Sequence, residues 1–503
     1  CVVSLLHEKG YFTQSFDDQN RQIASDVNWH KEDYLQLLPN QVQVEIEGRT
    51  VHLQAWKLPI HGHDGHIINV YFLDSNLPQN SDYDRSITAH LYGGNKWYRL
   101  CQEIVLGIGG IRLLRSLSIP ISKYHMNEGH AAFLTLELRN EYCNTGLCTT
   151  SNEFGSRNIR EECIFTTHTP VSAGHDRFDV DWVRRALGPK YNIDQLHCIE
   201  NGQFNMTKLA LNHSEFINGV AKKHREVSLK MFPGYCINSI TNGVHAQTWI
   251  SRHFQDLYDK YLPGWREDNF MFRYSLNLPD PELWLAHLRS KRDLIDYAAS
   301  QHQQKLDEHT LTIGFARRFA TYKRADLILS DLERLIQISD HVGKIQIIMA
   351  GKAHPNDQSG IDKLKHILDT INNYSDRIKI AFIPDYNMAV SKLMVSGSDI
   401  WLNTPIRTRE ASGTSGMKAT LNGVLNLSVL DGWWLEGWVE DVTGWAIGPA
   451  RDLDNDPSND DQADASDLYE KLKHKIIPTY YHDRAKWIFM MKHSISHNGS
   501  SQH

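Results

Sequence analysis

A loop of small residues runs directly into a lysine toward the end of the chain, where residues 410–423 read EASGTSGMKATLNG. Glycines allow a backbone to approach a ligand closely and to turn its N–H groups inward. A helix that begins near Thr414 would direct its positive end at a phosphate, and Lys418 would follow about one turn later. A lysine there can act as a counter-charge to phosphate or as an amine that forms a Schiff base. A capping loop with a solvated lysine is equally consistent with these residues alone.

A second stretch concentrates positive charge in residues 317–324, which read RRFATYKR. Its four cations are Arg317, Arg318, Lys323 and Arg324. The formal net charge of the whole chain is −7, so a phosphate substrate would need a local basic island of this kind. A solvated charged loop is the alternative that these residues leave open.

Both stretches lie in the second half of the chain, where apolar segments alternate with polar turns. Strands are predicted at 311–316, 345–351, 378–383, 399–402 and 424–430, and helices at 325–338, 361–371 and 388–395. This alternation predicts a parallel sheet that helices cover on both faces. In such a sheet ligands bind at the carboxyl ends of the strands, and the basic loop follows the first strand directly.

The first half carries a weaker pattern. Alternation predicts two strands within 41–56 with a turn at Gly48-Arg49, and a helical period covers 83–118 with a break at 91–94. The glycine-rich residues 107–110 lack a preceding strand, so they indicate close helix packing rather than a dinucleotide motif.

Three polar segments in this half each follow an apolar stretch. They read HMNEGH at 125–130, IFTTHTP at 164–170 and SITNGVH at 239–245. Each alone is best interpreted as an ordinary turn, although in a doubly wound sheet such segments can gather at the ligand-binding edge.

Other segments are predicted to have structural roles. Residues 205–217 are predicted to be helical, and aromatic-rich helices at 246–309 are predicted to join two lobes. The seven aspartates within 452–467 predict an exposed loop, and the polar tail from Ser494 is predicted to be disordered.

Composition sets broader bounds. A chain of 503 residues can hold two or three domains, and its net charge of −7 makes extensive nucleic-acid binding an unfavoured function. No apolar run approaches the roughly 20 residues of a membrane span. The seven cysteines show no CxxC pairing, which indicates reduced thiols and a cytoplasmic location. The histidines within 61–66 are interpreted as part of a turn, so no metal site is predicted.

The stretch at 410–423 resembles the pyridoxal-phosphate attachment motif of the α-glucan phosphorylases, the family that acts on glycogen, starch and maltodextrin. The resemblance extends from about residue 4 to about residue 490. It is strongest to the bacterial branch that carries AGKAHP and LDGWW, which stand here at 350–355 and 430–434.

The resemblance implies a role for individual residues. Lys418 would carry the cofactor, Arg317 would lie near its phosphate, and Arg318 and Lys323 would hold the substrate phosphate. Many family members have lysine where Arg317 stands, so this position is a like-charged departure. The implied sugar and cofactor contacts are Glu410, Gly413, Thr414, Tyr386, His168, Asn242, Asn127 and His130.

The resemblance also implies an α/β fold with two Rossmann-like lobes and the active-site cleft between them, as in GT-B-type glycosyltransferases. Residues 1–240 would form part of the glucan-binding lobe, 241–490 the cofactor- and phosphate-binding lobe, and 491–503 a polar tail. The expected reaction transfers a glucosyl unit from an α-1,4-glucan to inorganic phosphate and yields α-glucose 1-phosphate with retention. Two alternatives remain, a nucleotide-sugar glycosyltransferase resembling glycogen synthase and an inactive glucan-binding chain. A homodimer is left open.

One departure concerns the start of the chain, which begins at Cys1 and contains no match to the family's upstream G-G-L-G loop. We expect the N-terminal lobe to be incomplete and the last helices of the family to be missing. In the family, the upstream G-G-L-G loop helps to close the phosphate site. We therefore expect little activity from these 503 residues alone.

Overall fold

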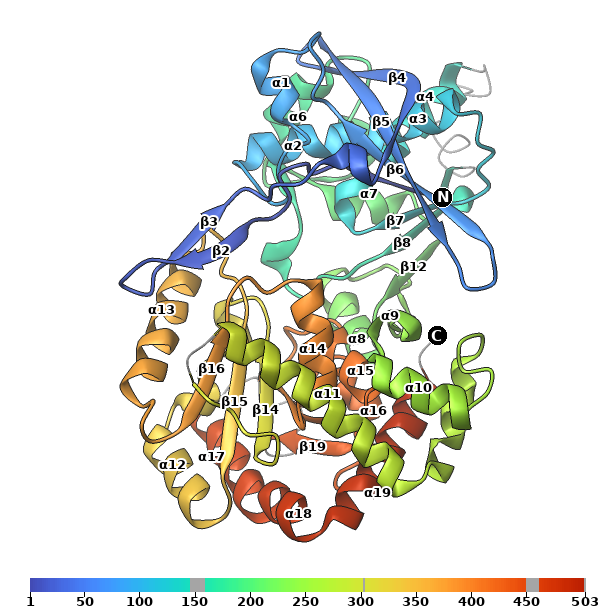
Figure 1. The fold of residues 1–503 in the computed structure, drawn as a ribbon. Helices are drawn as coiled ribbons and strands as arrows, with labels where there is room; N and C mark the ends of the chain where they lie inside the picture. Colours follow the sequence, from blue (N-terminus) through green and yellow to red (C-terminus); the bar gives the residue numbers. More distant parts are fainter. Residues whose placement is uncertain (145–158, 302–303, 449–460, 502–503) are drawn as a thin grey trace. The chain divides into compact units, whose positions relative to one another are not determined.

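The computed structural model describes residues 1–144, 159–301, 304–448 and 461–501 (Figure 1). The chain divides into two compact units. The first consists of Cys1–Thr13, Ser25–Val220 and Arg225–Ile240, and the second of Gln14–Ala24, Ala221–His224 and Thr241–His503. Across the described residues, no helix has the length and apolar character needed to span a bilayer.

The second unit is built on a six-stranded parallel sheet with the order β16-β15-β14-β17-β18-β19. Its strands are β14 (Leu311–Ala316), β15 (Ile345–Ala350), β16 (Lys379–Ile383), β17 (Ile400–Asn403), β18 (Leu425–Val429) and β19 (Gly444–Ile447). The first strand in sequence is central, and the order reverses between β14 and β17. This is the doubly wound arrangement, in which a crevice forms at the carboxyl ends of the two strands that flank the reversal. The predicted parallel sheet is confirmed.

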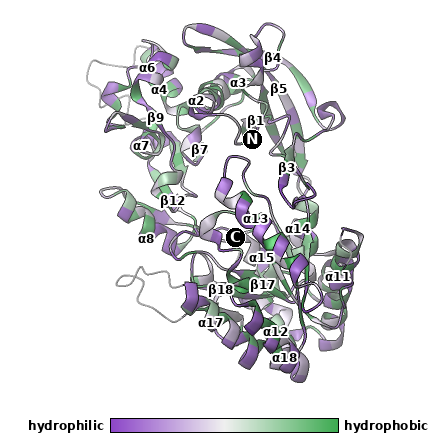
Figure 2. Ribbon diagram, turned by 90° about the vertical axis from the view of Figure 1, so that its left-hand side faces the viewer, coloured by the Kyte–Doolittle hydropathy of each residue, from purple (hydrophilic) through white to green (hydrophobic). Residues whose placement is uncertain are grey.

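Helices bury both faces of this sheet, which explains why its strands are almost continuously apolar. Along β15, Ile347 belongs to a core shared with α12 (Leu332–His341) and α13 (Gln358–Asn373). Its neighbour Ile348 belongs to a second core that also contains residues of two other helices. These are α11 (Asp280–Gln301) and α14 (Met388–Gly397). Figure 2 shows β17 and β18 as mainly hydrophobic, whereas α12 and α13 carry both colours.

The first unit contains two four-stranded sheets. The order β1-β6-β5-β4 is mixed, and the order β13-β12-β8-β7 is parallel. The strands of the mixed sheet are β1 (Val2–Leu5), β4 (Gln36–Ile46), β5 (Arg49–His61) and β6 (Ile67–Asp74). Those of the parallel sheet are β7 (Tyr124–Asn127), β8 (Cys163–Thr166), β12 (Phe216–Gly219) and β13 (Asn238–Ser239). The predicted hairpin is confirmed, since β4 and β5 pair through a turn in which Glu47 and Gly48 both have positive φ.

The predicted close packing at the glycines is also confirmed. Helix α2 (Lys96–Ile104) continues through the π-helical stretch η2 (Val105–Gly109) into α3 (Gly110–Ser116). A Cβ added at Gly107 would lie 2.7 Å from the backbone nitrogen of Leu134, so only glycine allows this approach.

Three predictions of secondary structure need correction. Residues 205–217 are not one helix, because α7 (Met206–Asn212) ends before strand β12 begins. The tail is not disordered over residues 494–501, the part of it that the structure describes. Helix α19 (Arg484–Ser494) continues into η10 (Ile495–Gly499), and Ile495 is fully buried in the core of the second unit. The prediction failed because the tail is mostly polar in composition, and its packing on the core depends on single apolar residues such as Ile495.

The predicted acidic loop at 452–467 falls partly on residues 449–460, which lie outside the described residues. From Asp461 onward the prediction is wrong, because the chain forms helix α17 (Asp461–Lys471). Buried Asp464 accepts hydrogen bonds from Arg324 (2.8 Å) and from both terminal nitrogens of Arg407 (2.8 Å each). These ion pairs turn an acidic stretch into an anchored helix.

A hairpin near the start of the chain, β2 (Thr13–Phe16) and β3 (Gln22–Ser25), contributes most of its residues to the second unit. The side chain of Gln14 donates to the carbonyl of Gly351 (2.9 Å) and accepts from the backbone N–H of Asp385 (2.9 Å). Gly351 has no room for a side chain, since a Cβ there would lie 1.9 Å from the carbonyl oxygen of Arg317. The hairpin therefore supports the loop that backs Arg317.

Candidate functional site

The basic loop and the glycine-rich loop, the two stretches that the sequence singles out for chemistry, lie at the carboxyl ends of β14 and β17. The basic loop begins at Arg317, directly after β14, and the glycine-rich loop lies between β17 and α15 (Thr414–Thr420). Arg324 ties these loops together, because its Nε donates to the carbonyl of Thr404 (2.9 Å) and its Nη2 to that of Pro405 (2.9 Å). The sheet topology thus brings both loops to the point where the strand order reverses.

A carboxylate and two cations form the centre of this site. One oxygen of Glu410, Oε2, accepts hydrogen bonds from Arg317 Nη1 (2.6 Å) and from Lys323 Nζ (2.6 Å). The side chains of these three residues are only 7–11% exposed. Arg317 also donates from Nη2 to the hydroxyl of Ser415 (3.1 Å). We call Arg317, Lys323 and Glu410 the basic cluster.

Burial and mutual charge shift the pKa values within the basic cluster. Burial alone would raise the pKa of Glu410, but Arg317 and Lys323 overcome that effect and lower it to about 2. Burial, with the nearby positive charge of Arg317, lowers the pKa of Lys323 to about 8. At neutral pH the cluster holds one carboxylate and two cations, and so keeps a net positive charge that suits an anion.

Several polar atoms around the basic cluster are buried without a hydrogen-bond partner among the described residues. They are Nε of Arg317, the hydroxyl of Ser412 and the amide oxygen of Asn403. Buried polar groups are normally satisfied, and unsatisfied ones are costly. A phosphate oxygen would accept from the two donors, so Nε of Arg317 and the hydroxyl of Ser412 fit an anionic ligand, whereas the Asn403 oxygen is an acceptor and does not favour one.

The glycine-rich loop takes the left-handed conformation that glycine favours, with φ of +87° at Gly413. Thr414 then opens α15, and Lys418 lies one turn later on the same short helix. The Lys418 ammonium group lies 3.6 Å from the ring centroid of Trp249. Burial lowers the pKa of Lys418, which favours the neutral amine that covalent chemistry with a carbonyl requires.

The other predicted residues of the second unit lie outside the basic cluster. Burial raises the pKa of Tyr386, whose hydroxyl donates to Ser391 (2.9 Å). Arg318 is exposed, on the loop that carries the cluster. Asn242 is half-buried in the segment between β13 and α9 (Ala246–Trp249). Within the described part of the chain, no hydrogen bond joins Asn242 to the basic cluster.

Asp431 is a neighbour that the sequence interpretation did not assign to the site. It follows β18 at the same edge of the sheet, and its Oδ2 accepts from the backbone N–H of Glu410 (3.0 Å). Burial raises its pKa to about 7. The motif LDGWW was noted only as a mark of the bacterial branch, but its position after an apolar strand was the signal that could have revealed Asp431.

The first unit gathers a separate set of predicted residues at the carboxyl ends of β7 and β8. These strands are parallel neighbours, so the loops after Asn127 and Thr166 lie side by side. The imidazole Nε2 of exposed His168 lies 3.2 Å from the side-chain oxygen of Asn127. Glu128, which was not predicted, accepts from the backbone N–H of His168 (2.7 Å) and from the hydroxyl of Thr169 (2.8 Å).

His130 lies on the short 3₁₀ turn η3 (Gly129–Ala131) that follows this loop. Burial, with a smaller contribution from the positive charge of Arg99, lowers the pKa of His130 to about 4. Partial desolvation by the surrounding residues also lowers the pKa of His168, although much of this residue is exposed. Both imidazoles are neutral at physiological pH, and each can offer one donor and one acceptor to a hydroxyl-rich ligand.

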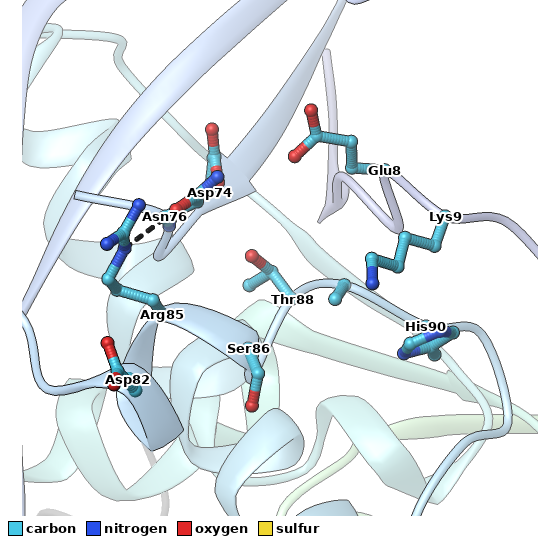
Figure 3. Close-up of a pocket in the computed structure, with 10 residues that line it drawn as sticks. Glu8, Lys9, Asp74, Asn76, Asp82, Arg85, Ser86, Thr88 and His90 are labelled. Atoms are coloured by element: carbon cyan, nitrogen blue, oxygen red, sulfur yellow. Dashed lines mark hydrogen bonds between the residues drawn. The ribbon is translucent and has the colours of Figure 1, made fainter. Parts of the chain in front are cut away.

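A cavity of about 270 Å³ in the same unit contains none of the predicted site residues (Figure 3). It is lined by Glu8, Lys9, Asp74, Asn76, Asp82, Arg85, Ser86, Thr88, Ala89 and His90. Two of its cations already have partners in the protein, since Arg85 donates to Asn76 (2.9 Å) and Lys9 pairs with Asp26 (3.2 Å). The cavity therefore gives no reason to move the candidate site away from the strand ends.

Comparisons with known proteins identify the family to which the sequence is similar. The family model of the carbohydrate phosphorylases matches residues 161–442. Maltodextrin phosphorylase of Thermococcus litoralis is 40% identical over 98% of this chain and 63% of its own length. Glycogen phosphorylase of Aquifex aeolicus is 33% identical over 98% of this chain and 77% of its own length. Glycogen phosphorylase of Mycobacterium tuberculosis is 33% identical, also over 98% of this chain, but over 63% of its own length.

The chain thus spans less than two thirds of two of these relatives and about three quarters of the third. The matched region includes His168, the basic cluster and Lys418. The chain belongs to the carbohydrate phosphorylase family.

Proposed function

We propose that the protein is an α-1,4-glucan phosphorylase. It transfers a glucosyl unit from the non-reducing end of a glucan to inorganic phosphate and yields α-glucose 1-phosphate with retention of configuration. The observation that carries this proposal is the basic cluster, in which Arg317 and Lys323 are buried around one carboxylate at the reversal of the strand order. The names of the relatives from Thermococcus and Aquifex, maltodextrin and glycogen phosphorylase, support the same substrate class.

Pyridoxal 5′-phosphate is the proposed cofactor, and the residues present fit it. The amine of Lys418 would attach the cofactor, since burial lowers its pKa and it lies one turn beyond the glycine-rich loop. The orphaned Nε of Arg317 would donate to the cofactor phosphate. Gly413 and Thr414 would offer it backbone N–H groups, and Tyr386 would lie beside its ring. When bound, the cofactor supplies a phosphate group that can exchange a proton with the substrate phosphate.

Two adjacent phosphate groups repel each other, and the positive charges of the protein's own side chains would offset that repulsion. We assign Arg318 and Lys323 to the substrate phosphate. Lys323 is held by Glu410 in the structure, so an incoming phosphate competes with that carboxylate for the ammonium group. Glu410, once released, remains anionic because its pKa is about 2, and it can accept hydrogen bonds from sugar hydroxyls.

The sugar would be recognised by neutral side chains. His168, Asn127 and His130 of the first unit, with Asn242, would exchange hydrogen bonds with the hydroxyls of the transferred glucose. Cleavage with retention passes through an oxocarbenium-like state, for which hydrolases commonly use two carboxylates. Here the substrate phosphate would give its proton to the leaving glycosidic oxygen and then form a bond to the anomeric carbon.

We infer a cytoplasmic location from the use of cysteine. Five of the described cysteines, Cys1, Cys101, Cys163, Cys198 and Cys236, are free thiols, three of them buried and two exposed. A reducing compartment preserves such thiols.

Borohydride reduction followed by peptide mapping tests the cofactor assignment. The purified protein should show the absorption of pyridoxal phosphate, and reduction should fix the label on Lys418. Label on a different lysine would refute the assignment of Lys418. A protein that contains no cofactor and transfers glucose only from a nucleotide sugar would instead belong with the glycogen synthase-like alternative.

A further inference from the structure

The turn at residues 430–434, LDGWW, is fastened to the glycine-rich loop at three successive points. We call it the Asp431 turn. The carboxyl oxygens of Asp431 accept from two backbone N–H groups, that of Glu410 (3.0 Å) and that of Gly432 (2.9 Å). One side chain thus joins the turn to the residue that supplies the carboxylate of the basic cluster.

The other two points lie further along the loop. The backbone N–H of Trp433 donates to the carbonyl of Ser412 (2.9 Å). Gly432 has a φ of +55°, and a Cβ there would lie 2.4 Å from the same carbonyl oxygen, so only glycine permits this contact. The Trp433 ring lies against Gly413, where an added Cβ would be 3.4 Å from its Cδ1. The loop from Glu410 to Gly413 therefore cannot move independently of the turn.

Asp431 is also placed to sense charge in the basic cluster. Asp431 is only 3% exposed, and the charged groups that face its carboxyl are Glu410 and Lys323. Burial and the negative charge of Glu410 raise the pKa of Asp431 to about 7, although its two backbone hydrogen bonds and Lys323 oppose this. Glu410 remains ionised across the neutral range, whereas Asp431 titrates within it.

We propose that Asp431 is a positioning residue of the basic cluster and that it takes up a proton when an anion binds there. The inference rests on the proposed assignment of the cluster to phosphate. An incoming dianion adds negative charge beside a carboxyl that is already repelled by Glu410, so the neutral form of Asp431 is favoured. Neutral carboxyl oxygens still accept hydrogen bonds, and the loop stays fastened while the charge of the site is rebalanced.

Sulfate is the appropriate probe, because it is a dianion that does not itself titrate near neutral pH. Calorimetric titrations at pH 7 in buffers with different ionisation enthalpies measure the protons taken up with sulfate. Wild-type protein should take up a larger fraction of a proton than Asp431→Asn, because a carboxyl with a pKa of about 7 is only partly protonated before binding. Lys323, with a pKa of about 8, contributes little at this pH and is present in both proteins.

Asp307→Asn is a matched control from the same unit. Asp307 also accepts a backbone N–H, that of His309 (2.9 Å), but it precedes β14 at the opposite edge of the sheet. This variant should take up as many protons as the wild type. Asp431→Ala is a second neutral variant, and it should show the same reduced proton uptake as Asp431→Asn. Thermal melts of each variant establish that it is folded.

The positioning role has its own readout in turnover, which is measured on a chain extended upstream with the family's G-G-L-G loop because little activity is expected without that loop. At pH 6 Asp431 is mostly neutral, so Asp431→Asn has the same charge as the wild type. Its amide NH₂ cannot accept a hydrogen bond, however, and one of the two backbone N–H groups loses its acceptor. Loss of the fastening should lower kcat more than it raises the KM for phosphate. Equal proton uptake by wild type and both Asp431 variants would overturn the inference and leave the phosphate assignment standing. Absence of sulfate binding by all proteins would overturn both.

Discussion

Replacement of Glu410 by glutamine removes the only carboxylate bonded to Arg317 and Lys323 among the described residues, and should have opposite effects on stability and on anion binding. The pKa of Glu410 falls from 4.5 to about 2 in the folded protein. At about 1.4 kcal/mol for each pKa unit, this difference corresponds to roughly 3 kcal/mol. Because the folded pKa is depressed, that stabilisation is fully present above pH 4.5 and is lost as pH falls through about 2. Glu410→Gln should therefore be less stable than wild type by about 3 kcal/mol at pH 7 and by much less near pH 2.

The same variant should bind sulfate more tightly. In the wild type an anion competes with Glu410 for the ammonium group of Lys323 and is repelled by the carboxylate. A unit charge at about 4 Å is worth roughly 4 kcal/mol at an effective dielectric constant of 20, and about 1.4 kcal/mol already changes an affinity tenfold. We expect the sulfate dissociation constant to fall by at least about tenfold, while glucan phosphorolysis falls because the sugar loses a hydrogen-bond acceptor.

Denaturant unfolding and calorimetry at pH 7 measure the two effects. Most of the 13 tryptophans lie in the second unit, so fluorescence follows mainly the part of the chain that holds Glu410. Glu333→Gln is the matched control, since Glu333 forms an exposed two-bond pair with Arg377 (2.6 and 2.8 Å). Exposed pairs contribute little, so this variant should differ from wild type by less than about 1 kcal/mol. A Glu410→Gln protein that is as stable as wild type and binds sulfate no more tightly would refute the competition between carboxylate and anion.

Three further substitutions address other parts of the site. Lys418→Ala should abolish borohydride-stable labelling by pyridoxal phosphate while the thermal melt of the cofactor-free protein stays close to that of wild type; persistent labelling would show that another lysine is the attachment point. Arg318→Ala should weaken phosphate binding by about 10- to 150-fold, the equivalent of a charge-assisted contact worth about 1.5–3 kcal/mol, with glucan affinity largely unchanged. An unaltered phosphate KM in steady-state assays would identify Arg318 as a surface residue. Asp464→Ala should destabilise the second unit by about 3–5 kcal/mol in denaturant unfolding, because Arg324 and Arg407 would be left as buried charges that have lost a shared partner. A loss below about 1 kcal/mol would mean that solvent reaches these arginines.

The residues that local pattern can reveal were predicted well from the sequence. Strand–helix alternation after residue 310 predicted the parallel sheet, because apolar runs of strand length separated by amphipathic helices have few other solutions. The same pattern put the basic loop at a strand end. Family resemblance then singled out Lys418 and the residues around it. These inferences depend on types and spacings within a few tens of residues, which a sequence displays directly.

Other features were decided only by tertiary structure. Glu410 meets Arg317 across 93 positions of sequence, and Asp431 reaches the Glu410 backbone only because β17 and β18 are neighbours. Helix α17 replaces a predicted loop because Asp464 finds two buried arginines, and the hairpin at residues 14–24 joins the second unit through Gln14. Each of these contacts depends on which distant groups share a buried site. The buried surroundings also set the chemistry of two carboxyl groups of similar intrinsic acidity. The cations Arg317 and Lys323 lower the pKa of Glu410 to about 2, whereas burial raises the pKa of Asp431 to about 7.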